Sequence, residues 1–135
     1  MARIADTWKQ PALEAGMAVC DGGTVEFWSG IRPLTPAGAP SGTLLATFTL
    51  DTPSYSWNGS GVLLVGTASP WVALIANSGT IGFARVKGGG VGQLDLTVTT
   101  VLVGTGDILV DAADLDVIAG RVLQIVSALI NIPNV

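Results

Sequence analysis

The residues that could carry chemistry in this sequence are mainly carboxylates, and their densest group lies late in the chain. Asp107, Asp111, Asp114 and Asp116 fall within one short stretch. Calcium needs several oxygen ligands from a flexible loop, and the spacing here does not match the EF-hand pattern. A calcium site would need backbone carbonyl ligands in addition. We interpret the group as a solvated loop between two apolar strands, where charge also discourages wrong strand pairing, and expect no bound metal.

The chain contains no histidine and a single cysteine, Cys20. Histidine is the commonest general base and the usual partner of a serine or cysteine nucleophile. Its absence excludes a hydrolytic triad, a histidine-ligated zinc site and a Cys–His pair. Cys20 cannot form an intrachain disulfide. Glu26 and Asp95 are a conceivable pair for glycoside hydrolysis, but that reaction needs a defined carboxylate separation, which the sequence does not establish.

A glycine-rich run resembles a phosphate-binding loop only superficially. The segment from Lys87 to Gly92 reads KGGGVG, whereas a P-loop ends in Gly-Lys-Ser/Thr and opens a helix. Here the lysine comes first and a β pattern follows, so a surface turn is the better interpretation. We expect a protein that is not an enzyme, with no catalytic residues and no cofactor.

The composition indicates a chain that buries part of its surface against other chains. Of its 135 residues, 49% are hydrophobic and only 12% are charged, against about 25% charged in a typical soluble domain. A surface short of charge is typical of a protein that assembles with copies or partners. The net charge of −4 and the six Lys and Arg residues argue against direct binding of nucleic acid.

Hydropathy does not predict a membrane protein. The stretch from Thr52 to Ala84 has no charged residue, but Thr67, Ser69 and Pro70 divide its apolar runs. A spanning helix needs about 20 mostly apolar residues in one piece. The first ten residues mix charged and polar side chains, unlike a signal peptide. We therefore expect no membrane partner.

The elements that must position these side chains are mostly strands. Residues 4–18 predict a short helix, which Pro11 shortens or begins. Asp51–Ser60 reads as a polar-aromatic loop, and Asn77-Ser78-Gly79 as a hairpin turn. Alternating or apolar runs predict strands over Thr24–Trp28, Thr43–Leu50, Gly61–Gly66, Trp71–Ala76, Thr80–Val86, Leu94–Val103 and Ile108–Val110.

The tail from Val117 to Ile132 fits either a strand or a helix. Ala119-Gly120 would interrupt a long helix, and Val and Ile are abundant, so we predict a strand. Eight or so short strands predict a mainly β fold, a single-domain β-sandwich or jelly-roll-like barrel with a short N-terminal helix. We expect an N-terminal arm with that helix over residues 1–22 and the β-sandwich domain over residues 23–135.

Two stretches carry a resemblance to a known family. Residues 23–33 read GTVEFWSGIRP, and residues 39–50 read APSGTLLATFTL. They are similar to small virion proteins of tailed bacteriophages and prophages. That family shares a short N-terminal helix, a strand ending in a Gly-x-x-Pro turn, and a proline-bearing loop into Ser/Thr-Gly-Thr-Leu-Leu-Ala. Residues 77–80 and 117–122 match it more loosely.

The resemblance implies a structural role in a virion that is assembled in the host bacterial cytoplasm. We expect a capsid decoration or cement protein, a homo-oligomer bound to the major capsid protein or other virion proteins. A tail, neck or fibre-attachment component is the alternative. A carbohydrate-binding β-sandwich module that uses tryptophans is an alternative of another class. From the residues themselves we predict interface contacts at Trp28, Tyr55, Trp57, Leu63, Leu64 and Trp71.

Overall fold

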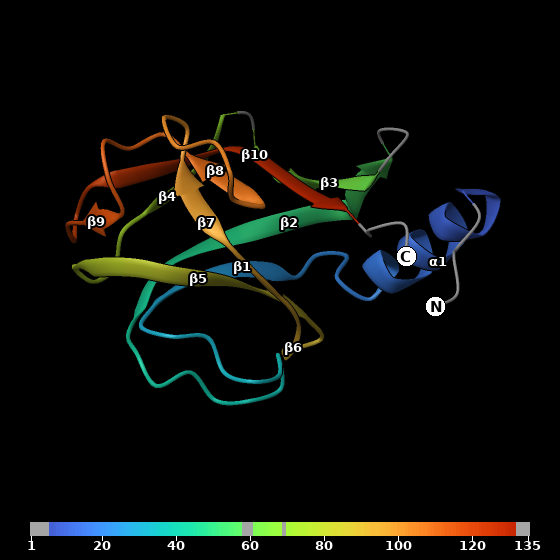
Figure 1. Cartoon of the computed structure of the whole chain (residues 1–135), viewed down its shortest axis with the longest axis horizontal. Coiled ribbons are helices and arrows are strands. Elements are labelled where there is room, and N and C mark those ends of the chain that lie inside the picture. Colours follow the sequence, from blue (N-terminus) through green and yellow to red (C-terminus); the bar gives the residue numbers. More distant parts are fainter. Residues whose placement is uncertain (1–5, 58–60, 69, 132–135) are drawn as a thin grey trace.

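The chain folds into a mainly β structure with one short helix (Figure 1). The computed structural model describes residues 6–57, 61–68 and 70–131. The described elements are α1 (Asp6–Ala18), β1 (Thr24–Ser29), β2 (Leu44–Trp57), β3 (Gly61–Gly66), β4 (Trp71–Leu74), β5 (Gly79–Gly88), β6 (Val91–Leu96), β7 (Val98–Thr100), β8 (Ile108–Val110), β9 (Asp116–Val117) and β10 (Val122–Asn131). The predicted fold class is confirmed: a nearly closed, barrel-like sheet with a short N-terminal helix.

One segment closes this sheet. The strands lie in the order β6-β5-β1-β2-β3-β10-β8-β7, with β4 paired to β10 and β9 paired to β5. The strands at the two ends of this series, β6 and β7, belong to the single segment Val91–Thr100. Its first part pairs antiparallel with β5, at Leu96 opposite Ala84, and its second part pairs parallel with β8. The segment therefore joins both ends of the sheet into a barrel-like wall.

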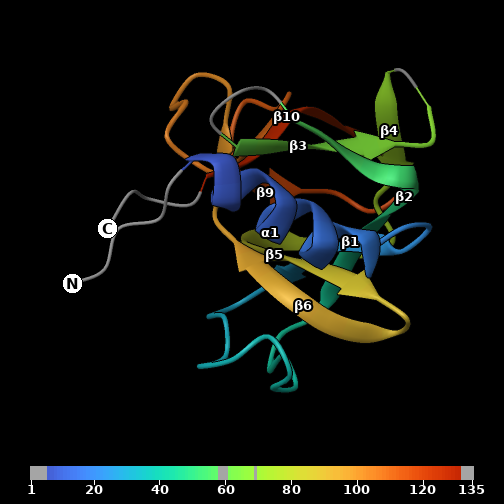
Figure 2. The same cartoon turned by 90° about the vertical axis from the view of Figure 1, so that its right-hand side faces the viewer.

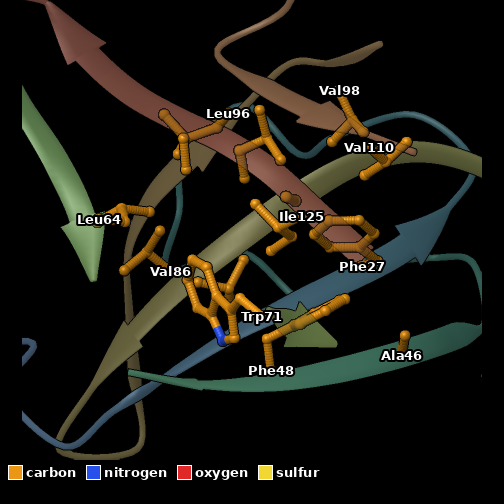
Figure 3. Packing of buried hydrophobic residues seen from close by; sticks show 14 of the residues in the cluster. Phe27, Ala46, Phe48, Leu64, Trp71, Val86, Leu96, Val98, Val110 and Ile125 are labelled. Carbon is orange, nitrogen blue, oxygen red and sulfur yellow. The ribbon is translucent and has the colours of Figure 1, made fainter. Parts of the chain in front are cut away.

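Alternating side chains fill the interior of the barrel. On β1, Val25 and Phe27 are fully buried, while Glu26 between them faces outward, as the two-residue period of a strand requires. The ring of Phe48 lies 5.1 Å from that of Phe27 and 5.8 Å from that of Trp71, the latter edge to face. Figure 3 shows these aromatic rings among aliphatic side chains from facing strands.

Helix α1 lies across one end of the barrel, beside β3 (Figure 2). The side chain of Met17, on this helix, and that of Cys20, just after the helix ends, are both buried. Ser54 on β2 holds the end of the helix: its hydroxyl donates to the Met17 carbonyl at 2.9 Å, and its backbone N–H donates to the Asp21 carboxylate at 2.8 Å. The first of these bonds gives the hydroxyl of the fully buried Ser54 its hydrogen-bond partner, as buried polar groups require.

The predicted loop over Asp51–Ser60 is wrong for its described part. β2 continues to Trp57, because its second half pairs with β3, with Tyr55 opposite Leu64 and Trp57 opposite Val62. A register shift between Leu50 and Tyr55 accommodates the polar residues that suggested a loop. Residues 58–60 lie outside the described residues.

The predicted hairpin at Asn77-Ser78-Gly79 is also wrong. β4 pairs with β10, whereas β5 pairs with β1, β6 and β9. The segment between them instead crosses from one side of the barrel to the other. Asn77 fastens it by donating its side-chain amide to the Leu44 carbonyl at 2.9 Å. Asn77 is a bend and Gly79 is already the first residue of β5, so these residues form a crossing segment and not a hairpin turn.

The predicted strand in the tail is confirmed as β10 from Val122 to Asn131, with residue 132 outside the described part. The N-terminal helix is confirmed over Asp6–Ala18, with Pro11 in its interior, and residues 4 and 5 lie outside the described part. The expected strand over Leu94–Val103 divides into β6 and β7. Within the described residues, no helix is long and apolar enough to cross a membrane.

Gly66 should be sensitive to a single added methyl group. A Cβ at Gly66 would lie 2.3 Å from atoms of the Trp71 indole, so Gly66→Ala forces the ring to move and should destabilise the fold by about 1–3 kcal/mol. Gly16 on α1 has open space around it, so Gly16→Ala should stabilise by up to about 1 kcal/mol. Urea unfolding of both variants tests this, and equal midpoints would contradict it.

Candidate interaction surface

Charge is distributed unequally around the barrel. Strands β3, β4, β10, β8 and β7 are neighbours in the sheet, and none of them contains a charged residue. The strands of the other half carry Glu26, Asp51, Arg85, Lys87 and Asp95. A strand with one face toward water normally alternates apolar and polar residues. The charge-free half departs from this rule.

The outward side of β4 and β10 exposes aliphatic side chains. Leu74 and Val122 are directly opposite each other across the two strands, and they are 63% and 64% exposed. Val72 stands opposite Gln124, and Val126 is 50% exposed. The intervening residues on β10 are buried in the core. These neighbours form a contiguous apolar patch of the kind that marks interaction sites.

The patch continues onto β3. Leu63 lies opposite Leu129 of β10, and both are half-buried. Because the residues on either side, Val62 and Leu64, are buried, Leu63 points outward. We call the outward side of β3, β4 and β10 the charge-free face.

A groove interrupts the charge-free face. β3 and β4 both pair with β10, β3 near its end and β4 near its start. Between them, β3 and β4 leave a hollow of about 670 Å³, lined by residues that include Val65, Pro70, Val126 and Ser127. Trp71 also lines it, and its indole Nε1–H is buried without a hydrogen-bond partner among the described residues. Among the residues that the structure describes, no charged side chain lines this groove.

The six residues predicted for an interface do not share one surface. Leu64 and Trp71 are buried in the core. Tyr55 and Trp57 are half-buried and packed against that core. Trp28 lies on the charged half, where its indole donates to Glu26 at 3.2 Å. Of the six, Leu63 points outward on the charge-free face, and Leu64 and Trp71 line the groove in that face.

The carboxylates are engaged in structural contacts. Glu26 pairs with Lys87 at 3.0 Å and Asp95 with Arg85 at 2.8 Å, so both members of the conceivable glycosidase pair hold cations. In the acidic stretch, Asp107 accepts bonds from the Thr97 backbone and hydroxyl. Among the described residues, no three acidic or cysteine side chains gather as metal ligands would.

The turn after Lys87 is a hairpin between β5 and β6. Gly89 and Gly90 have φ values of 63° and 80°, the left-handed conformation that a two-residue hairpin turn favours. This agrees with the interpretation of the run as a surface turn.

The environment of Cys20 makes its thiol unreactive. Burial first, and then the charge of Asp21, raise the pKa of the thiol. A raised pKa lowers the thiolate fraction at neutral pH.

Sequence reasoning missed a second exposed apolar element, the proline loop, residues 30–43 between β1 and β2. Ile31 and Leu34 on this loop are 86% and 104% exposed. The signal for it was present, since large aliphatic residues are unusual in a segment otherwise made of proline, glycine and small residues. The sequence could not show that no other described part of the chain covers them.

A buried arginine holds the proline loop. Arg85 on β5 is 3% exposed and binds Asp95 of β6 through two nitrogens, at 2.8 and 3.0 Å. It also donates to the Gly38 carbonyl of the loop, and lies 3.5 Å from the Thr35 carbonyl. The bond to Asp95 raises the pKa of the guanidinium and outweighs burial, which lowers it. The cation is therefore permanent, and loop carbonyls complete its shell of acceptors.

Comparison of the chain with protein-family models, with curated proteins and with solved structures found no match. The resemblance to virion proteins therefore stays a prediction from the sequence, and the function must be argued from the surface itself.

Removing the arginine should cost far more stability than removing the lysine two residues later. Arg85→Ala leaves the Asp95 carboxylate buried without its cation and should destabilise by about 3–5 kcal/mol. Lys87 is on the same strand, but its ion pair with Glu26 is partly exposed, so Lys87→Ala should cost about 0–1 kcal/mol. Urea unfolding monitored by tryptophan fluorescence gives both values. Similar losses in the two variants would show that Arg85 is not a structural centre.

Proposed function

We propose that this chain is a structural protein of a tailed-bacteriophage particle, a capsid decoration protein that assembles through its charge-free face. The observation that carries the proposal is the exposed aliphatic surface of β4 and β10, on which Leu74 and Val122 are the most exposed pair. The similarity of residues 23–33 and 39–50 to virion proteins supports the bacteriophage setting.

The physical requirements of a decoration protein fit such a face. A cement protein bridges neighbouring shell subunits, and each contact adds to the work of separating them. Permanent interfaces are more apolar than transient ones. Burying one aliphatic side chain is worth roughly 1.5–3 kcal/mol, so a face with several of them can supply a stable contact without any charge.

The proposal assigns the chain a binding role with virion proteins as partners, and no catalytic one. Its location on purified particles tests it directly. A copy number that matches the symmetry of the shell supports decoration. A small number at one vertex would instead indicate a neck or tail component, and absence from the particle would refute the proposal.

Two adjacent leucines separate assembly from folding. Leu64 faces the core and Leu63 faces outward, so Leu64→Asp should unfold the domain, whereas Leu63→Asp should stay folded and bind particles at least about tenfold more weakly, the effect of about 1.4 kcal/mol. Circular dichroism reports folding, and co-sedimentation with particles lacking the protein reports binding.

The matched control is Val91→Asp, which places the same charge on an exposed valine of β6 in the charged half. It should fold and bind normally. Normal binding by the Leu63 variant would show that the charge-free face is not the contact surface.

A further inference from the structure

We propose that the proline loop of one copy docks the tip formed by Ile31 and Leu34 into the groove of a second copy. The inference rests on the proposed function insofar as it uses the charge-free face. It adds which segment of another copy binds to part of that face, and how the two copies are related in the contact.

The proline loop is held in one conformation. Its ends are joined by the Ser29 N–H to Thr43 carbonyl bond at 3.0 Å and by the Thr43 N–H to Ser29 hydroxyl bond at 2.8 Å. Its middle is turned by the Gly38 N–H to Thr35 carbonyl bond at 3.0 Å, and Arg85 binds that turn from below. A loop fixed before binding loses little entropy when it docks.

This loop presents its largest apolar side chains to water. Leu34 is fully exposed and Ile31 nearly so, although Arg85, a member of a buried ion pair, binds the Thr35–Gly38 turn that follows them. An anchored loop that points two aliphatic side chains outward has the features of a contact element, because functional contacts are concentrated on loops carried by a rigid scaffold.

The groove offers the complementary shape and polarity. It is concave, is lined by aliphatic and small residues such as Val65 and Val126, and contains no charged side chain. In Figure 1 the proline loop lies at the bottom of the molecule, while β3 and β10 lie at the top. The loop therefore cannot fill the groove of its own chain, and the occupant must come from another molecule.

Charge selects this approach between two copies. The chain carries a net charge of −4, so two copies repel each other over most approaches. The groove is neutral, and the only charged residue of the proline loop is Arg32, whose sign is opposite to the net charge of the copy it would approach. Beside the groove, Asp51 is exposed and directly follows Leu50, the backbone partner of Gly66.

The contact joins two different surfaces, so it is heterologous. Such contacts generate rings when the rotation closes and open chains when it does not. Two aliphatic side chains bury much less than the roughly 800 Å² per partner of a standard stable interface. We therefore expect weak, concentration-dependent self-association in solution, which a shell would strengthen by placing copies side by side.

Sedimentation velocity of the full chain tests the docking of the loop. Leu34→Asp removes the tip and Val126→Asp charges the groove. Each variant should self-associate at least about tenfold more weakly than the wild type. Ala39→Asp, on an exposed position of the same loop, should associate normally. Pro70→Asp is a second groove variant, for use if Val126→Asp does not fold by circular dichroism.

A mixing experiment identifies the symmetry. The Leu34→Asp variant retains an intact groove, and the Val126→Asp variant retains an intact tip. An equimolar mixture should therefore form dimers but nothing larger. Failure of the mixture to form dimers, normal association of Leu34→Asp, or a wild type that stays monomeric at every soluble concentration would each overturn the inference. If Leu63→Asp fails to bind particles but Leu34→Asp still binds them, the proposed function stands and does not depend on docking of the loop.

Discussion

The structure depends on one constraint, the closure of the sheet by the segment Val91–Thr100. This segment pairs with β5 at its beginning and with β8 at its end, so it leaves the ends of the sheet little exposed backbone for strand addition. It also brings Asp95 opposite Arg85 across the β5–β6 hairpin, where the two side chains form the buried ion pair. Closure of the barrel and anchoring of the proline loop are therefore consequences of the same strand pairing.

Burial of a cation is expensive, and the partners of Arg85 show what it stabilises. One partner is Asp95, and another is a carbonyl of the proline loop. Replacing such a pair by apolar residues is often neutral or stabilising in other proteins, so stability alone does not explain a buried arginine. The arginine does provide several donors in a fixed geometry, and these hold the Thr35–Gly38 turn of the proline loop, just after the exposed Ile31 and Leu34.

The sequence was informative where a local pattern decides the structure, and uninformative where distant pairing decides it. Alternation predicted β1, an apolar run predicted β3, and β-branched residues with Ala119-Gly120 predicted the strand in the tail. The serine and proline residues near Ser54 suggested a loop, because nothing local shows that β3 pairs with them or that Met17 accepts the Ser54 hydroxyl. Tryptophans were taken as contact residues by type, whereas Trp71 fills the core beside Gly66. Ile31 and Leu34 are exposed because no other described part of the chain packs over them. Only the folded structure shows this.

The unequal distribution of charge around the barrel has a physical consequence. A chain with 12% charged residues could have spread them evenly and remained soluble. Here both described salt bridges and the buried arginine lie on β1, β5 and β6, where they fasten the barrel and the loop. The strands of the opposite half carry no charge, which removes the desolvation cost that an ion would add to a contact with their outward faces. A rigid apolar projection on one side and a neutral, hollowed face on the other are the two elements that a directional contact between copies requires, and the single sheet carries both at a fixed separation.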